Sequence, residues 1–200
     1  MEQIFSMLIG YLIGSVNPAA IISVLKKRDL RKEGTCNLGA TNTTLIFGKK
    51  MGAVVLVCDM AKSSLACFIS RILFPASVIS VMISGIGAIL GHIFPFYFKF
   101  KGGKGLAAFA GFVLFFDPLI FLILLIICTA IMFIVNYSVG MPVSAAVLFT
   151  FFVFLKTNSF SQTVCAGLAG IIILISHQGI FKRIKAKEEC KIREMIKQIF

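Results

Sequence analysis

The feature that most constrains this chain is a series of apolar segments joined by short polar connections. Several approach the roughly 20 residues that an α-helix needs to cross a bilayer. Hydrophobic residues make up 58% of the sequence, which leaves too little polar surface for a soluble domain. We therefore predict an all-α polytopic membrane protein that forms one domain over residues 1–200. The predicted spans cover residues 4–25, 51–70, 76–94, 105–116, 119–135, 143–155 and 163–181.

The number of spans depends on the fourth and fifth segments, which only Asp117 and Pro118 separate. They form either two helices or one kinked helix. With seven spans, seventeen of the twenty Lys and Arg residues lie on one side of the membrane, whereas six spans divide them eleven to eight. Because positive charge accumulates on cytoplasmic loops, we expect seven spans, with the N-terminus outside and the C-terminus in the cytoplasm.

This topology gathers four polar, helix-breaking segments on the cytoplasmic face. Such a gathering favours a site for a polar ligand, although long connections also occur without one. The segments are residues 34–44, 91–107 and 136–142, and the end of the last span around His177.

Residues 91–107 (GHIFPFYFKFKGGKGLA) combine lysines and glycines between two apolar runs. Glycine permits turn conformations in which backbone N–H groups point at an anion, so the segment suggests a phosphate site. It is equally consistent with a cytoplasmic connector that satisfies the orientation rule. A nucleotide P-loop is excluded, because Phe98 and Gly105 occupy positions where that motif needs Gly and Ser or Thr. The lysines and glycines of the suggested phosphate site are Lys99, Lys101, Gly102, Gly103 and Lys104.

Residues 34–44 (GTCNLGATNTT) carry hydroxyl and amide groups that are suitable donors for a phosphate or a polyol. Asp59 and Lys62 lie within a predicted span. Ionisable groups in such a place either have a functional role or form an internal ion pair that holds the helices together. Histidines at span ends, such as His92 and His177, are usually interfacial hydrogen-bonding groups.

The six cysteines form no CxxC pair, and four lie in apolar runs, which indicates packing residues in a reduced compartment. The net charge of +12 could indicate nucleic acid, but in a membrane protein it more simply marks faces that meet anionic lipid. We therefore expect no metal ligation, no nucleic-acid partner and contact with membrane lipids.

Three motifs together resemble those of the bacterial acyl-phosphate:glycerol-3-phosphate acyltransferases: GSVNPA, GTCNLGATN and GHIFPFYFKFKGGKGLA, in this order and at these distances. The similarity covers nearly the whole chain. It implies a multi-pass enzyme of the inner (plasma) membrane whose site faces the cytoplasm. Such an enzyme moves a fatty acyl group from acyl phosphate to the 1-hydroxyl of glycerol 3-phosphate, giving lysophosphatidate and phosphate in the first step of phospholipid synthesis. It uses no cofactor, metal or covalent acyl-enzyme.

The resemblance also assigns site residues by position. It implies catalytic roles for Lys104, which would contact phosphate, for His177, and for Thr35, where the family usually has serine. The substrate-binding residues that it implies are Asn37, Thr41, Asn42, Gly102, Gly103 and Ser138.

This sequence departs from the family pattern at several positions. Leu45 and Ile180 replace a usual arginine and asparagine, and Cys36 and Lys187 replace glycines. The departures leave open a catalytically weakened or inactive paralogue that binds lipid or acyl phosphate. A small anion or proton transporter is a third hypothesis, motivated by the intramembrane Asp59 and Lys62, but the polar segments all fall on one face.

Overall fold

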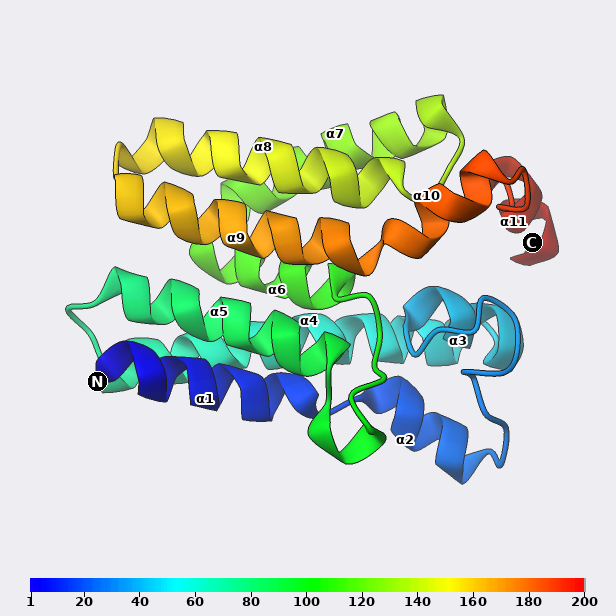
Figure 1. Cartoon of the computed structure of the whole chain (residues 1–200), viewed down its shortest axis with the longest axis horizontal. Coiled ribbons are helices and arrows are strands. Elements are labelled where there is room, and N and C mark those ends of the chain that lie inside the picture. The colour runs from blue at the N-terminus through cyan, green and yellow to red at the C-terminus, as the bar shows by residue number, and fades with distance from the viewer. Residues whose placement is uncertain (200) are drawn as a thin grey trace.

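In the computed structural model, which describes residues 1–199, every regular element within that range is a helix (Figure 1). This confirms the predicted all-α class. The elements are α1 (Glu2–Ser15), α2 (Pro18–Leu25), α3 (Ala40–Phe47), α4 (Lys49–Leu73), α5 (Val78–Ile93), η1 (Phe96–Phe98), α6 (Leu106–Phe116), α7 (Pro118–Val135), α8 (Gly140–Thr157), α9 (Phe160–Ser176), α10 (Gln178–Lys185) and α11 (Ile192–Ile199).

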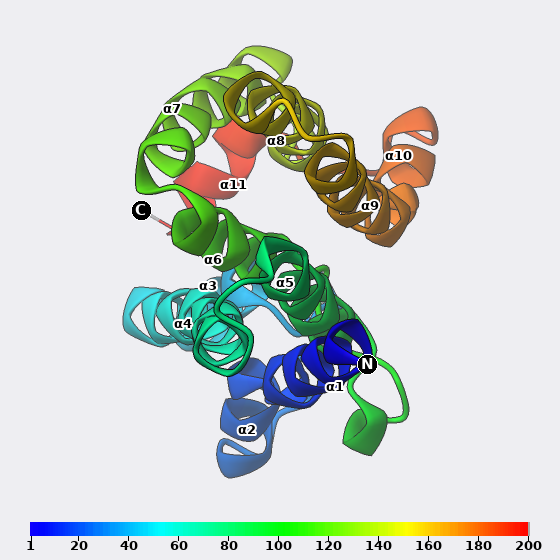
Figure 2. The same cartoon turned by 90° about the vertical axis from the view of Figure 1, so that its left-hand side faces the viewer.

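The helices form two groups that meet at α6. Figures 1 and 2 show α1, α4 and α5 on one side of α6 and α7, α8 and α9 on the other. Helices α1 and α5 pack very closely, because glycines line their contact. A Cβ on Gly10 would lie 2.0 Å from the Ser84 carbonyl oxygen, and one on Gly91 would lie 2.2 Å from the Tyr11 carbonyl oxygen. Small residues of this kind allow helix backbones to approach within a membrane.

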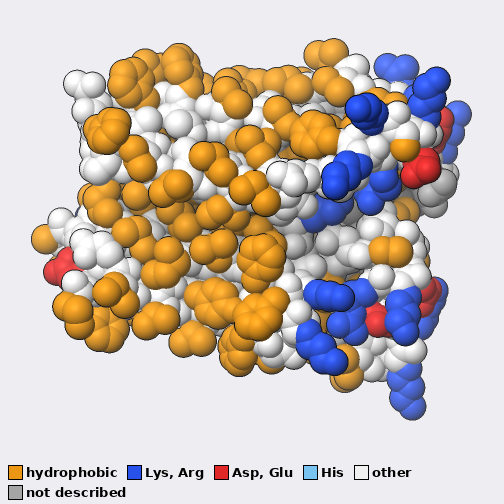
Figure 3. Space-filling view, viewed as in Figure 1, with side chains coloured by type: hydrophobic (Ala, Val, Ile, Leu, Met, Phe, Trp, Pro, Cys, Tyr) orange, Lys and Arg blue, Asp and Glu red, His pale blue; other side chains and the backbone are white. Residues whose placement is uncertain are grey.

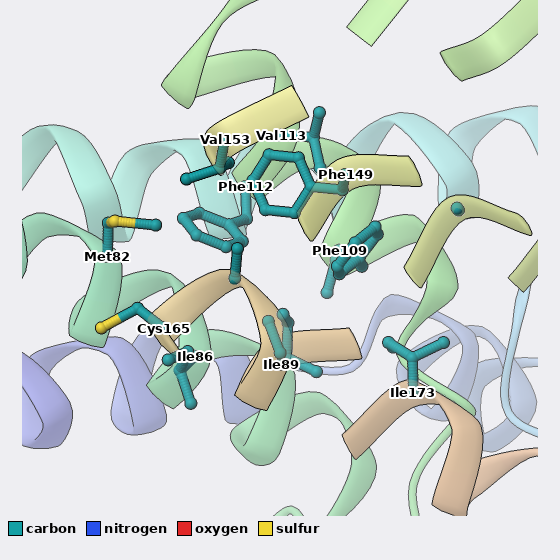
Figure 4. Close-up of a cluster of buried hydrophobic side chains, with 14 of the residues drawn as sticks. Met82, Ile86, Ile89, Phe109, Phe112, Val113, Phe149, Val153, Cys165 and Ile173 are labelled. Atoms are coloured by element: carbon teal, nitrogen blue, oxygen red, sulfur yellow. The ribbon is translucent and has the colours of Figure 1, made fainter. Parts of the chain in front are cut away.

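An aromatic cluster fills the space between the two groups (Figure 4). The ring centroids of Phe109 and Phe112 each lie 5.5 Å from that of Phe149, with the rings nearly perpendicular. Edge-to-face pairs at this separation are favourable, so α6 is held against α8. The cluster also contains Met82, Ile86, Ile89, Val113, Val153, Cys165 and Ile173.

Five segments of the described chain are long and apolar enough to cross a membrane, and the pair α9 and α10, bent by 45°, makes a sixth if it counts as one span. Helix α6, with 11 residues, is too short to cross alone. The prediction of a polytopic helical membrane protein is confirmed. The seven-span count and the orientation stay predictions.

The predicted interruption of the first span lies between α1 and α2. Asn17 is fully buried there, and its Oδ1 accepts a hydrogen bond of 2.9 Å from the Ala20 amide, which caps α2. Pro18 occupies the first helical position, where its missing N–H is not needed. The break leaves the Val16 carbonyl outside the helical hydrogen-bond pattern and available to another helix.

Lysines and arginines gather at one end of the bundle, over α2, α3, α10 and α11, while apolar side chains cover most of the remaining visible face (Figure 3). The N-terminus and the C-terminal helix lie at opposite ends (Figure 1). The cation-rich end also holds the connection from α5 to α6 and the turn from α7 to α8. Most of the predicted polar segments therefore meet at one end of the molecule.

Candidate active site

Lys104 lies in the short loop before α6 and is tied to the last long helix. The Ser176 hydroxyl lies 2.7 Å from the Lys104 carbonyl oxygen and donates a hydrogen bond to it. Lys104 is half-buried and lies two residues before α6, whose first amides have no acceptor within the helix. A lysine next to a helix N-terminus provides a suitable environment for an anion.

His177 stands at the bend between α9 and α10 and is 4% exposed. Its Nδ1 lies 2.8 Å from the Ile173 carbonyl oxygen, which can only accept a hydrogen bond. Nδ1 therefore carries the proton, and Nε2 of the neutral ring is an acceptor. Lys104 is close enough for its charge to act on His177, so the structure brings these two predicted residues together.

Arg183 and Glu189 complete the charge pattern around Lys104. The Arg183 Nε donates to the Glu189 carboxylate at 2.6 Å, and the Glu189 side chain is only 8% exposed. Burial and the neighbouring Arg183 lower the pKa of Lys104, while Glu189 acts in the opposite direction. The sequence prediction missed both residues, because a pair six positions apart has no helical or strand spacing that would identify it.

The glycine pair before Lys104 has a different role from the one predicted. The Gly102 amide donates to the Ile93 carbonyl at 3.0 Å, and the Gly103 amide donates to the His92 carbonyl at 3.1 Å. These N–H groups are therefore engaged within the chain rather than pointed at a ligand. Glycine is needed because a Cβ at position 102 would lie 2.0 Å from the His92 carbonyl oxygen.

Asn42 also differs from its predicted role. It is fully buried, its Oδ1 accepts from the Thr35 amide at 2.7 Å, and its Nδ2 donates to the carbonyls of Leu30 and Glu33 at 2.8 and 3.0 Å. All its principal hydrogen-bonding groups are used by the loop itself. Asn42 thus holds the loop that carries Thr35, and its predicted substrate-binding role stays a prediction.

The first loop nevertheless reaches the glycine pair. A Cβ on Gly103 would lie 2.6 Å from the Leu38 carbonyl oxygen, so the two loops are in contact. Half-buried Asn37 is next to this contact, whereas Thr41 is exposed. Thr41 lies in helix α3, which the sequence did not predict, since this stretch was expected to be a loop.

Ser138 is half-buried in the turn between α7 and α8, and the C-terminal segment docks on this turn. The amides of Ile192 and Arg193 donate to the Asn136 carbonyl and to its Oδ1, each at 3.1 Å. Ile192 is buried. The C-terminal tail therefore packs against the protein at the cation-rich end.

An apolar groove begins beside the Lys104 loop and runs between α6, α7 and α8. Leu106, two residues after Lys104, lies at its start together with Met141 of α8. Its walls are wholly hydrophobic or sulfur-containing, which suits a hydrocarbon chain. The other lining residues are Phe109, Ala110, Val113, Phe121, Leu124, Leu125, Cys128 and Ala145.

The positions that depart from the family pattern fall into two kinds. Leu45 is half-buried in α3, and Ile180 is 3% exposed in α10, so both are apolar side chains packed into the cation-rich end. Cys36 and Lys187 have φ angles of 55° and 62°, in the left-handed region that favours glycine.

These features define a helical integral membrane protein with a cationic, histidine-containing site at one end and an apolar groove beside it. The family model described as glycerol-3-phosphate acyltransferase matches residues 4–187. The chain therefore belongs to the glycerol-3-phosphate acyltransferase family, which confirms the resemblance inferred from the motifs.

Individual relatives agree with this assignment. The glycerol-3-phosphate acyltransferase of Desulfotalea psychrophila is 37% identical over 193 residues, covering 94% of this chain and 97% of that protein. The Bacillus subtilis enzyme of the same name is 33% identical, with coverages of 93% and 95%. The crystal structure of PlsY (YgiH), an integral membrane glycerol 3-phosphate acyltransferase, in its glycerol 3-phosphate form superposes with a TM-score of 0.87 at 28% identity, covering 96% of each chain. Its lysophosphatidic acid form gives 0.86 at 27% identity, with coverages of 98% and 99%.

Proposed function

We propose that this protein transfers a fatty acyl group from an acyl phosphate to the 1-hydroxyl of glycerol 3-phosphate, releasing lysophosphatidate and inorganic phosphate. The observation that carries the proposal is a wholly apolar groove whose lining includes Leu106, two residues after Lys104. An acyl phosphate has the matching chemistry, with a charged head and a long hydrocarbon tail. Glycerol 3-phosphate is proposed as the acceptor because the PlsY relative was crystallised in its glycerol 3-phosphate form.

In this mechanism Lys104 holds phosphate oxygens, and the groove between α6 and α8 holds the acyl tail. The 1-hydroxyl oxygen attacks the acyl carbonyl carbon, a new C–O ester bond forms, and the C–O bond to the phosphate breaks. The hydroxyl proton passes to the departing phosphate, which leaves as hydrogen phosphate. An acyl phosphate is already activated, so positioning and charge stabilisation dominate the catalysis.

His177 orients the acceptor in this proposal. Its Nδ1–H is engaged by the Ile173 carbonyl, so Nε2 accepts a hydrogen bond from the other hydroxyl group of glycerol 3-phosphate. Thr35 and Asn37 bind substrate from the first loop, and Ser138 and Thr41 contribute from neighbouring segments. Arg183 supplies a second cation near Lys104, which offsets the loss of the family arginine at Leu45.

We further propose that the single domain spans the inner membrane seven times, with the site facing the cytoplasm. The short α6 would be one of the spans, completed at its ends by the adjoining loops. Support comes from the N-terminus and the C-terminal helix lying at opposite ends of the bundle, as an odd number of crossings requires, and from the cations at the end that holds this helix (Figures 1 and 3).

The test is an assay of the purified protein in lipid vesicles with acyl phosphates of several chain lengths and glycerol 3-phosphate. Lysophosphatidate and phosphate should appear in equal amounts, and neither should form when glycerol 3-phosphate is omitted. Absence of lysophosphatidate with every chain length would refute the proposed reaction.

A further inference from the structure

A buried charged cluster joins α1, α4 and α5 directly behind the Lys104 loop. Asp59, Lys62 and His92 are 1%, 7% and 2% exposed. The Lys62 Nζ lies 2.8 Å from the Asp59 Oδ1, 2.9 Å from the His92 Nδ1 and 2.7 Å from the Val16 carbonyl oxygen. A lysine ammonium has three donors, and here each has one acceptor.

This arrangement fixes the tautomer of His92. Because Lys62 can only donate, the His92 Nδ1 must accept, and the ring proton is on Nε2. A proton on Nδ1 would face the ammonium group, donor against donor. The His92 Nδ1 and the Asp59 Oδ1 lie 3.2 Å apart because both accept hydrogen bonds from the Lys62 ammonium, and there is no hydrogen bond between them.

The other side of His92 supports the loop that carries Lys104. Its main-chain carbonyl accepts from the Gly103 amide at 3.1 Å, and a Cβ on Gly103 would lie 2.2 Å from its Nε2. The ring and carbonyl of His92 thus form the surface on which Gly103 lies. Lys104 is the next residue along the chain.

The cluster is poorly explained by stability alone. Removing a carboxylate and an ammonium from water is costly, and well-packed apolar residues often serve a fold as well. Asp59 Oδ2 is also buried without a hydrogen-bond partner among the described residues, which adds to the cost. Retention of such a cluster against the Lys104 loop favours a role in the site.

We propose that Asp59, Lys62 and His92 form a positioning network that sets the place of Lys104. Lys62 fastens the break after α1 to Asp59 and His92, and His92 in turn fixes Gly103. This inference rests on the proposed function, since Lys104 is taken to hold substrate phosphate. None of the three network residues needs to touch substrate.

The test compares the native protein with Lys62→Met and with the double variant Asp59→Asn/Lys62→Met, which removes both charges together. The double variant should unfold at a temperature close to that of the native protein, because no unpaired buried charge remains. Its kcat/KM should nevertheless fall roughly ten- to a hundredfold, as expected when a catalytic group is misplaced. Ser63→Ala, on the same buried stretch of α4, is the matched control and should retain native kcat/KM.

A spectroscopic measurement separates positioning from general destabilisation. The chain has two histidines, so 15N-histidine labelling gives two ring systems. The native His92 should show the Nε2–H tautomer and His177 the Nδ1–H tautomer, and the double variant should lose the fixed His92 tautomer. Glycerol 3-phosphate should shift the His177 signals, and the double variant should need about tenfold more of it.

A native His92 with Nδ1–H, or a folded double variant with native kcat/KM and native ligand response, would overturn the network. A native protein that responds to glycerol 3-phosphate but makes no lysophosphatidate would refute the proposed reaction alone, because the ligand response of the double variant still tests the network.

Discussion

The Ser176 hydroxyl donates a hydrogen bond of 2.7 Å to the carbonyl of Lys104, joining two residues 72 positions apart. The same hydroxyl lies 2.7 Å from the Ile173 carbonyl oxygen, which also accepts from the His177 Nδ1. The contact fixes the end of α9 against the start of α6. It places the two residues on which the proposed chemistry depends at one site.

The alkaline limb of the pH profile should report Lys104. Burial and Arg183 lower the pKa of Lys104 below the ordinary 10.5. As the pH rises, the ammonium that binds phosphate should therefore lose its proton before pH 10.5 is reached. Because kcat/KM reports the free enzyme, it should decline on the alkaline side with an apparent pKa below 10.5.

Arg183→Gln should move this limb to higher pH. The substitution removes a like charge near Lys104 and leaves Glu189 to favour the ammonium, so both changes raise the pKa of Lys104. An alkaline limb that stays in place in Arg183→Gln would show that another group controls it. Lys182→Gln, at an exposed neighbouring position, is the control and should leave the limb unchanged.

Glycine should stabilise the protein at positions 36 and 187. Cys36 and Lys187 are exposed and have left-handed φ angles, which cost a non-glycine residue about 1–2 kcal/mol. The larger unfolded-state entropy of glycine offsets part of this gain. Cys36→Gly and Lys187→Gly should each raise the free energy of unfolding by about 0.5–1 kcal/mol. Thermal unfolding in lipid or detergent measures this, and a lower midpoint in both variants would contradict the account.

A bulky residue in the apolar groove should impair use of the acyl donor. Ala110→Phe places a ring where the tail is proposed to lie, so KM for long-chain acyl phosphate should rise while KM for glycerol 3-phosphate stays near native. Val147→Phe adds a similar ring on an exposed part of α8 and should leave both constants unchanged. Equal effects of the two variants would argue against the groove as the tail site.

The apolar replacements in the site should weaken activity rather than abolish it. Leu45→Arg with Ile180→Asn restores the residues usual in the family, and it should change kcat/KM by less than about tenfold, or roughly 1.4 kcal/mol. The reason is that Arg183 already supplies a cation beside Lys104. Product formed only by the double variant would instead establish the native chain as an inactive paralogue.

Much of the fold could be predicted from sequence because lipid imposes a strong pattern on it. The apolar runs predicted the membrane helices, and the distribution of Lys and Arg predicted that the polar segments lie at one end. The sequence did not predict helix α3, because the segment 40–47 is short and rich in threonine and asparagine, which are typical of loops. Its existence depends on packing against α4, which no local pattern encodes.

The site was harder to predict, because it depends on contacts between distant segments. Lys104 and His177 were identified from motifs, but motifs do not say which way a group points. Asn42 and the glycine pair proved to hold the loops through hydrogen bonds with the chain itself. Arg183 and Glu189 meet through a left-handed turn at Lys187, which the sequence marks only as a departure from glycine.

The most direct measurement of the central claim compares Lys104→Ala with Lys101→Ala in vesicles supplied with acyl phosphate and glycerol 3-phosphate. Both remove a lysine from the same loop, but Lys101 is exposed and Lys104 is half-buried beside His177. Losing a charged hydrogen bond costs about 1.5–3 kcal/mol, so Lys104→Ala should lower lysophosphatidate formation at least roughly tenfold. Lys101→Ala should stay near native. Equal activity of the two variants would contradict the assignment of Lys104 as the phosphate-binding residue.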